Sequence, residues 1–281
     1  MEDIKKELFK YGICDKSIDV LSNKEGIIVC RVLDNKKSYI IKYFYNLEFR
    51  REIRWYNILK DLGIKTIDMY GQTSKSLLLE DINNNKEYRL AKKEDLNDKK
   101  IVKSIAKYYR NLHNKGEIFL SKNDISLYSE LDLLSSENLM MLMSKIRNND
   151  YSFWNKIKEK IENSKEYLKN NKTITYNDFY YGNLIISNIK DNAYMFDYNL
   201  MGVGFKYLDI SNVLYGFNNE MKNVFLAEYG DINKTEIELS NVLSPIIGLI
   251  IAYSKNEFPK WGEEIKEKLL SDEYNRLINS K

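Results

Sequence analysis

The sequence predicts an α+β fold, in which five short strands and one main helix precede a longer, mostly helical part. Before residue 82, runs of β-branched and aromatic residues alternate with polar turns, which is typical of strands. Beyond residue 100, apolar residues recur at three- and four-residue steps, which is typical of amphipathic helices. The stretch between them is rich in Asn, Lys, Asp and Glu. We therefore expect an N-terminal lobe at 1–82, a hinge and connection at 83–100, and a helical lobe at 101–281.

In the first lobe, the polar turns SNKEG and DNKK separate three β-rich runs that suggest a meander after a short N-terminal helix. A helix is expected over Leu47–Leu62, because Phe49, Ile53, Tyr56 and Leu59 share one face and Gly63 follows. The five expected strands are Ser17–Leu21, Ile27–Leu33, Ser38–Phe44, Ile67–Tyr70 and Ser76–Ile82.

Two further helices are expected in the second lobe. Apolar positions at helical spacing mark one helix from Ile101 to Leu112 and another from Trp154 to Leu168. Between Thr173 and Phe196, short strand-like runs are interrupted by a polar and aromatic loop. We therefore expect a hairpin-like insert inside a helical lobe.

Composition excludes several classes of protein. The 281 residues are 43% apolar and 30% charged, as in an ordinary globular chain, and the net charge of +3 gives no strong basic field for nucleic acid. Cys14 and Cys30 belong to no CxxC motif, so neither a disulfide scaffold nor a zinc site is expected. The apolar stretch Val242–Tyr253 is about 12 residues, too short for a bilayer. We expect a cytoplasmic monomer without nucleic-acid or membrane partners.

The segment most informative about chemistry contains Asp178, Asn183 five residues later, and Asp197 after the next strand. A hairpin returns its strand ends to the same side, so these oxygen-bearing side chains can converge. Mg²⁺ prefers oxygen ligands, and it usually takes one or two carboxylates together with substrate phosphates. The alternative is that Asn, Asp and Gly only make turns here.

This segment, YNDFYYGN followed by FDY, resembles the signature of the aminoglycoside phosphotransferase and choline kinase family, relatives of the protein kinases. The resemblance implies a two-lobed protein-kinase-like fold, with Asp178 as the catalytic residue and Asn183 and Asp197 as Mg²⁺ ligands. Asp209 matches a structural aspartate of the family. Tyr176 departs from the usual histidine, which puts the hydrogen bonding of this loop in doubt more than phosphoryl transfer.

The same resemblance implies a lysine that contacts the nucleotide phosphates and a glutamate that orients it. Lys42 lies in an otherwise apolar strand and matches that lysine. Glu52 on the following helix fits the partner position best. Glu48, one helical turn earlier, is the alternative, although a carboxylate near a helix start also suits the helix dipole.

Two backbone contributions to nucleotide binding are also expected from the resemblance. The turn with Ser22, Asn23 and Gly26 would cover the phosphates, although a single glycine fits a plain hairpin equally well. The hinge residues Glu80 and Ile82 would contact the nucleotide base through their backbone. His113, the one histidine, is interpreted as a packed or helix-terminal residue, which disfavours hydrolase chemistry.

We therefore expect a kinase that uses ATP or GTP with Mg²⁺ and phosphorylates a hydroxyl of a small cationic acceptor, an aminoglycoside first. Choline or a ketosamine is the alternative acceptor, and a non-catalytic nucleotide-binding pseudokinase is the alternative function. Carboxylates for a polycation are available at Glu220, Glu228, Asp231, Glu236, Glu238, Glu263 and Glu264. Aromatic residues that could instead enclose a quaternary ammonium group are Tyr215, Phe217 and Trp261.

Overall fold

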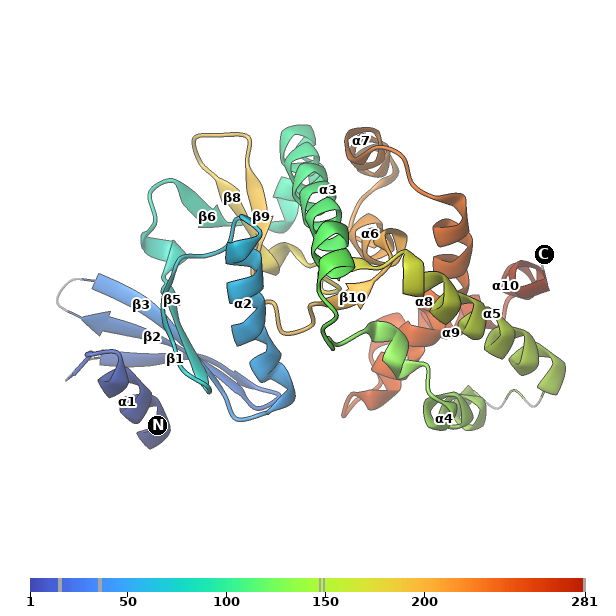
Figure 1. Cartoon of the computed structure of the whole chain (residues 1–281), viewed down its shortest axis with the longest axis horizontal. Coiled ribbons are helices and arrows are strands. Elements are labelled where there is room, and N and C mark those ends of the chain that lie inside the picture. Colours follow the sequence, from blue (N-terminus) through green and yellow to red (C-terminus); the bar gives the residue numbers. More distant parts are fainter. Residues whose placement is uncertain (15–16, 35–36, 147, 149, 280–281) are drawn as a thin grey trace. The chain divides into compact units, whose positions relative to one another are not determined.

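The computed structural model describes residues 1–14, 17–34, 37–146, 148 and 150–279. The chain forms two compact units, each assembled from separate stretches. Unit 1 comprises Met1–Leu112, Asp178–Met201 and Gly216–Tyr229, and unit 2 comprises His113–Asn177, Gly202–Tyr215 and Gly230–Lys281. The fold is α+β, as predicted, with a five-stranded antiparallel sheet early in the chain and mostly helices after it (Figure 1).

The five-stranded sheet of unit 1 has the order β1-β2-β3-β5-β4. Its strands are β1 (Ser17–Lys24), β2 (Ile27–Asp34), β3 (Lys37–Phe44), β4 (Met69–Gln72) and β5 (Ser76–Glu80). All neighbouring strands pair antiparallel. The meander and the two later strands are therefore confirmed.

The side chains of strand β3 alternate between an apolar face of this sheet and the face that carries Lys42. Ile41 and Tyr43 belong to an apolar cluster with Ile4 and Leu8 of α1 (Glu2–Lys10). Successive side chains of a strand point to opposite faces, so Lys42 projects away from α1. There it meets α2 (Arg51–Asp61), which follows the 3-10 helix η1 (Glu48–Arg50) within the predicted helical segment.

Residues 83–100, expected to be only a connection, contain regular structure. After η2 (Ile82–Asn84) come β6 (Tyr88–Leu90) and η3 (Lys93–Asn97). Strand β6 pairs with β8 (Leu184–Ser187), which pairs with β9 (Ala193–Met195). Backbone pairing and the ring contact between Tyr88 and Tyr194, 5.4 Å between centroids, hold this strand without an apolar run. The segment expected as a hinge and connection therefore contains a strand and two 3-10 helices that its composition did not indicate.

The strands expected between 173 and 196 are present, but they belong to two sheets. Strands β8 and β9 form the expected hairpin in unit 1, whereas β7 (Thr173–Thr175) pairs with β10 (Gly202–Gly204) in unit 2. The strand β10 was not predicted, because three residues with two glycines carry no strand signal. Gly202 is required there, since a Cβ would lie 2.5 Å from the carbonyl oxygen of Tyr128.

Helices account for most of the remaining chain. The two predicted helices are α3 (Lys99–Lys122) and α5 (Tyr151–Asn170), and both extend beyond the predicted bounds. The others are α4 (Ser136–Ile146), α6 (Lys206–Tyr215), α7 (Asn219–Tyr229), α8 (Lys234–Ser254), α9 (Lys260–Leu269) and α10 (Asp272–Asn279). A short 3-10 helix, η4 (Glu130–Leu133), precedes α4.

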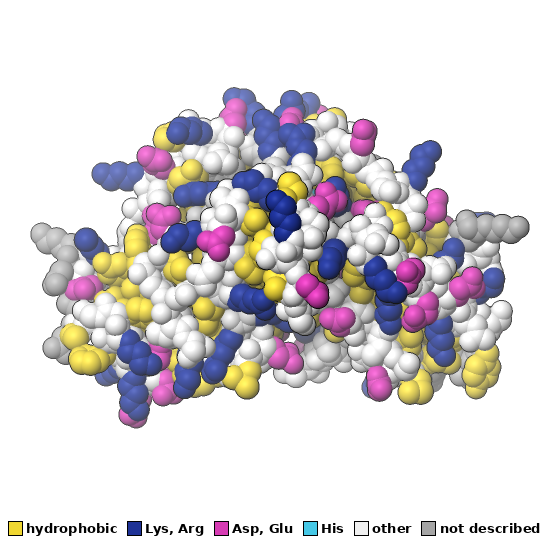
Figure 2. Space-filling model, in the orientation of Figure 1, with side chains coloured by type: hydrophobic (Ala, Val, Ile, Leu, Met, Phe, Trp, Pro, Cys, Tyr) yellow, Lys and Arg dark blue, Asp and Glu magenta, His cyan; other side chains and the backbone are white. Residues whose placement is uncertain are grey.

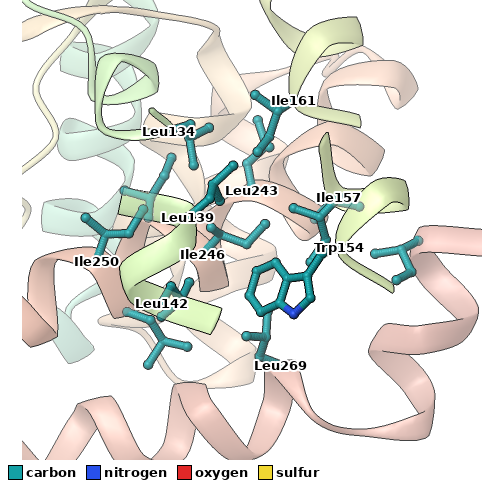
Figure 3. Packing of buried hydrophobic residues seen from close by; sticks show 14 of the residues in the cluster. Leu134, Leu139, Leu142, Trp154, Ile157, Ile161, Leu243, Ile246, Ile250 and Leu269 are labelled. Carbon is teal, nitrogen blue, oxygen red and sulfur yellow. The ribbon is translucent and has the colours of Figure 1, made fainter. Parts of the chain in front are cut away.

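Helix α8 lies in the apolar core of unit 2. Its Leu243, Ile246 and Ile250 pack with Trp154 and Ile157 of α5 in one buried cluster (Figure 3). At 21 residues, α8 is longer than the expected apolar stretch, and by length and composition alone it could cross a membrane. Core helices can be equally long and apolar, and 56% of an apolar 18-residue stretch of α8 is buried inside the protein. Packing therefore accounts for its apolar character.

Candidate active site

The side chain of Lys42 joins two carboxylates of unit 1. Its Nζ lies 2.6 Å from Oε2 of Glu52 on α2 and 2.6 Å from Oδ1 of Asp197, which follows β9. The side chains of Lys42 and Glu52 are 7% and 1% exposed, whereas Asp197 is 33% exposed. Glu48, the alternative partner, is exposed in η1. The structure thus brings Lys42, Glu52 and Asp197 together.

Burial and charge shift the pKa values in this cluster in a consistent way. Burial alone would lower the pKa of Lys42, but the carboxylates of Glu52 and Asp197 outweigh it and raise that pKa. Burial raises the pKa of Glu52 to about 7, and Asp197 adds to this effect while Lys42 opposes it. Lys42 is therefore held as a cation, and Asp197 presents the more accessible carboxylate.

Asp178 and Asn183 contact each other in the loop before β8. The amide Nδ2 of Asn183 donates to Oδ2 of Asp178 at 2.9 Å, and Asn183 follows Asp178 through the 3-10 helix η5 (Tyr181–Asn183). The carbonyl of Asn183 accepts from the backbone N–H of Phe196 at 3.0 Å, which extends the β8–β9 pairing by one step. The hairpin therefore brings Asn183 next to the segment that carries Asp197.

The donor set fits a divalent cation of the hard type. Because the amide nitrogen of Asn183 is engaged by Asp178, its oxygen is the atom left for a cation. Asp197 contributes a partly exposed carboxylate that uses one oxygen on Lys42. Within the described residues, no group of three or more His, Cys, Asp or Glu side chains is arranged to hold a metal. Two oxygen ligands match Mg²⁺ that is shared with phosphates, not a complete protein cage.

A buried hydrogen-bond network in unit 2 supports the residues directly before Asp178. The carboxylate of Asp209 accepts from the backbone N–H groups of Tyr176 at 2.8 Å and Asn177 at 2.9 Å. Nε2 of His113 lies 3.0 Å from the same carboxylate, and both side chains are fully buried. His113 is thus a packed residue within α3. The loop is held through its backbone, which does not depend on a histidine at position 176.

Asn177, directly before Asp178, has a φ of +66°. Left-handed backbone is uncommon outside glycine, and asparagine tolerates it best among the larger residues. The N–H groups of two successive residues, Tyr176 and Asn177, are both bound by the carboxylate of Asp209, which fixes the backbone that leads into this conformation. The sequence therefore places asparagine where the turn into Asp178 requires it.

The predicted phosphate-covering turn is tighter than expected. Ser22 and Asn23 lie within β1, paired with Val29 and Ile28, and not in a loop. The turn consists of Glu25 and Gly26, with φ of +53° and +78°, a pattern typical of a two-residue hairpin. A Cβ on Gly26 would lie 2.9 Å from Cβ of Asn46, so glycine is required by the fold.

The expected hinge residues Glu80 and Ile82 lie at the end of β5 and just after it, and Asn85 donates a hydrogen bond to each. Glu80 ends β5 and accepts from Asn85 at 2.6 Å, while the carbonyl of Ile82 accepts from the N–H of Asn85 at 3.0 Å. Between them, buried Asp81 accepts from Arg31 Nε at 2.6 Å. Burial alone would raise the pKa of Asp81, but the bonds from Arg31 and Ser38 outweigh it and lower that pKa.

Several of the candidate acceptor residues have local roles instead. Glu220 pairs with Lys99 at 2.7 Å, and Glu228 lies within 4.0 Å of Lys107. Buried Glu236 accepts from the N–H of Tyr207 at 2.9 Å, and Phe217 is a buried residue in ring contact with Phe179. More exposed candidates are Asp231, Glu238, Glu263, Glu264, Tyr215 and Trp261. On the face shown in Figure 2, basic and acidic side chains are interspersed.

Sequence reasoning missed the contacts that α2 makes with the residues after Asp197. Arg51 Nε donates to the carbonyl of Asn199 at 2.5 Å, and Trp55 Nε1 donates to the carbonyl of Met201 at 3.0 Å. Arg51 and Trp55 are four residues apart, so they lie on the same side of α2. That spacing was readable, but their backbone acceptors leave no mark in a sequence.

Comparison with known proteins places the fold. No family model matches the sequence, and no curated protein sequence matches it. Among solved structures, choline kinase LicA from Streptococcus pneumoniae is 15% identical with a TM-score of 0.66, covering 100% of this chain and 99% of its own. Spectinomycin phosphotransferase, in complex with ADP and spectinomycin, is 16% identical with a TM-score of 0.58, covering 99% of this chain and 97% of its own.

A GDP and kanamycin complex of APH(2″)-IIIa is 9% identical, with a TM-score of 0.63 and coverage of 98% and 99%. Likeness at this level of identity establishes shared architecture. The chain has the kinase-like fold of these proteins along its whole length, which confirms the predicted fold.

Proposed function

We propose that this protein is a small-molecule kinase that transfers the γ-phosphoryl group of a nucleoside triphosphate to a hydroxyl of a small cationic acceptor. The observation that carries the proposal is the pairing of buried Lys42 with Glu52 and Asp197, at 2.6 Å each, in the unit that also holds the Asp178–Asn183 contact. A buried cation that faces an accessible carboxylate suits a phosphate and its metal.

Lys42, Glu52 and Asp178 each have a defined task in this reaction. Lys42, oriented by Glu52, binds the α- and β-phosphates as a compact positive charge. Asp178, half-buried and hydrogen-bonded to Asn183, orients the acceptor hydroxyl and takes its proton as the oxygen bonds to the γ-phosphorus. The bond from that phosphorus to the β–γ bridging oxygen breaks, and the nucleoside diphosphate leaves.

Mg²⁺ held by Asp197 and Asn183 would neutralise the negative charge on the phosphates. The chain's own contribution is to position these two ligands. Asn183 is fixed by its bond to Asp178, and Asp197 by its bond to Lys42.

For the acceptor, we propose an aminoglycoside first and choline or a related amino alcohol second. The first candidate is supported by the likeness to complexes with spectinomycin and kanamycin. The second is supported by the likeness to LicA and by the local pairing of Glu220, Glu228 and Glu236, which leaves fewer carboxylates for a polycation. For the donor, ADP and GDP complexes among the similar structures support both ATP and GTP.

The test is release of nucleoside diphosphate from ATP or GTP, measured with Mg²⁺ and a panel of kanamycin, spectinomycin, choline and ethanolamine. Acceptor-dependent release that is lost in Asp178→Asn would support the proposal, and the active acceptor would identify the substrate class. Mg²⁺-dependent binding of ATP without transfer to any acceptor would favour the non-catalytic pseudokinase. Absence of nucleotide binding would refute both.

A further inference from the structure

The five residues Asp197–Met201, here called the 197–201 turn, hold the candidate metal ligand in a backbone conformation that needs support. Asp197 has a φ of +65°, in the left-handed region. Such residues cost about 1–3 kcal/mol and persist only when their surroundings fix them. What fixes Asp197 therefore decides whether its carboxylate is ready for a cation.

Part of the support lies within the turn itself. The Tyr198 hydroxyl is fully buried and donates to the carbonyl of Met195 at 2.6 Å. The N–H of Met201 donates to the carbonyl of Tyr198 at 3.2 Å, which closes the turn. These bonds fix the side of the turn that faces β9.

Helix α2 holds the turn through side chains from two successive helical turns. Arg51 Nε donates to the carbonyl of Asn199 at 2.5 Å, and Trp55 Nε1 to the carbonyl of Met201 at 3.0 Å. The ring of Tyr56 meets that of Tyr198 edge-on, with centroids 4.9 Å apart.

Burial makes the loss of the Trp55 hydrogen bond costly in stability. Trp55 is 1% exposed and Met201 is fully buried, so a lost indole N–H would leave a buried carbonyl without this donor. An unsatisfied buried polar group costs more than a surface bond returns. A core position that needed only apolar volume would not require a ring with a directed donor.

We propose that Arg51 and Trp55 are positioning residues for the metal, because they anchor the carbonyls of Asn199 and Met201 and so hold Asp197 in its cation-binding conformation. The inference rests on the proposed function. It goes beyond the Lys42–Glu52 pair, because Arg51 and Trp55 bind the backbone carbonyls two and four residues after Asp197.

The test compares Trp55→Phe and Arg51→Met with a matched control, Trp154→Phe. Trp154, whose ring is seen in Figure 3, is also 1% exposed. Its indole N–H donates to the backbone carbonyl of Asn148 at the same 3.0 Å. It lies in α5 of unit 2, whereas Trp55 lies in unit 1. The two Trp→Phe variants therefore each remove an indole–carbonyl bond, buried at Trp55 and partly buried at Trp154, from different places.

Calorimetric titration of ADP, with and without MgCl₂, is the main readout. We expect the apparent affinity for Mg²⁺ to fall about five-fold in Trp55→Phe and Arg51→Met, since each loses its hydrogen bond to a carbonyl of the turn. ADP binding without Mg²⁺ should not change, and Arg51→Lys should recover part of the loss. Hydrogen exchange at amides 197–201 should speed up in the two variants and not in Trp154→Phe.

The outcomes separate the inference from the proposed function. If Trp55→Phe and Trp154→Phe lower thermal stability alike and neither alters the Mg²⁺ dependence, Trp55 is a core residue and the inference fails. If Asp197→Ala keeps full Mg²⁺-dependent ADP binding, the metal role of Asp197 fails and the proposed function with it. Should Trp55→Phe not fold, the comparison of Arg51→Met with Arg51→Lys decides the question.

Discussion

Removing the charge of Lys42 should destabilise the protein chiefly because Glu52 is left buried without its cation. Glu52 is 1% exposed and lies 2.6 Å from Nζ of Lys42. Breaking a buried ion pair from one side costs about 3–5 kcal/mol, and Lys42→Met keeps most of the aliphatic volume. We expect this cost in Lys42→Met. Glu52→Gln should cost less, about 1–2 kcal/mol, because Lys42 retains Asp197.

The double variant distinguishes pairing from packing. Once Glu52 is neutral, Lys42→Met no longer strands a buried charge, so the double variant should be more stable than the sum of the single effects predicts, by about 2 kcal/mol. Native-state hydrogen exchange of amides in β3 and α2 measures these free energies locally. The measurement belongs at about pH 8.5, where Glu52, whose pKa burial raises to about 7, is ionised.

The exposed pair Lys6–Glu2, 2.8 Å apart, is the control cycle and should show no measurable coupling. Additivity within about 0.5 kcal/mol at Lys42 and Glu52 would refute the reasoning, because it would mean that neither carboxylate nor ammonium responds to the loss of the other.

Three further outcomes are expected. Asp178→Asn keeps an oxygen that can accept from Asn183 but cannot take a proton, so turnover in the acceptor assay should fall about 10²–10⁴-fold while the dissociation constant for ADP stays the same; equal loss of both would contradict its role. Asp81→Asn weakens the bond from Arg31 and should lower stability by about 2 kcal/mol near neutral pH. The pKa of Asp81 in the folded protein lies below its ordinary value of 3.8, so the stability difference between the wild type and Asp81→Asn should persist above pH 3.8 and vanish as the pH falls through the folded pKa. Urea unfolding at several pH values measures this difference. A difference that does not change with pH would be evidence against the ion pair. Gly26→Ala places a Cβ 2.9 Å from Cβ of Asn46 at a φ of +78° and should lower the melting temperature, whereas Gly230→Ala, with φ of +100° and open space around it, isolates the backbone part of the effect. Equal losses in the two glycine variants would rule out the Asn46 contact.

Periodicity made the main sheet predictable from sequence. Strands β2 and β3 are rich in β-branched and aromatic residues, β1 carries Ile18 and Val20 near its start, and the polar turns between the strands are short. Strands β6 and β10 escaped prediction because they are three residues long and are held by partners far away in the chain. A single-sequence pattern contains no information about such partners.

The residues of the candidate site also fall into those that the sequence indicates and those that it does not. Lys42, Asp178, Asn183 and Asp197 stand out as charged and amide side chains in otherwise apolar or turn-forming segments. Their roles, and the choice of Glu52, came from the resemblance to the aminoglycoside phosphotransferase and choline kinase family. Their assigned roles stay predictions until the assays above are done. The supports at Arg51, Trp55 and Asn177 could not be found, since they act through backbone carbonyls and a local φ angle.

The discontinuous path of unit 1 has a consequence for biosynthesis. Lys42 and Asp197 are 155 residues apart, and the last stretch of the unit ends at Tyr229. A nascent chain that has emerged only to residue 112 carries the whole five-stranded sheet but lacks β8 and β9. Contacts between distant residues form late and slow folding. The ribosome must therefore have delivered most of the polypeptide before the ammonium group on β3 can meet the aspartate.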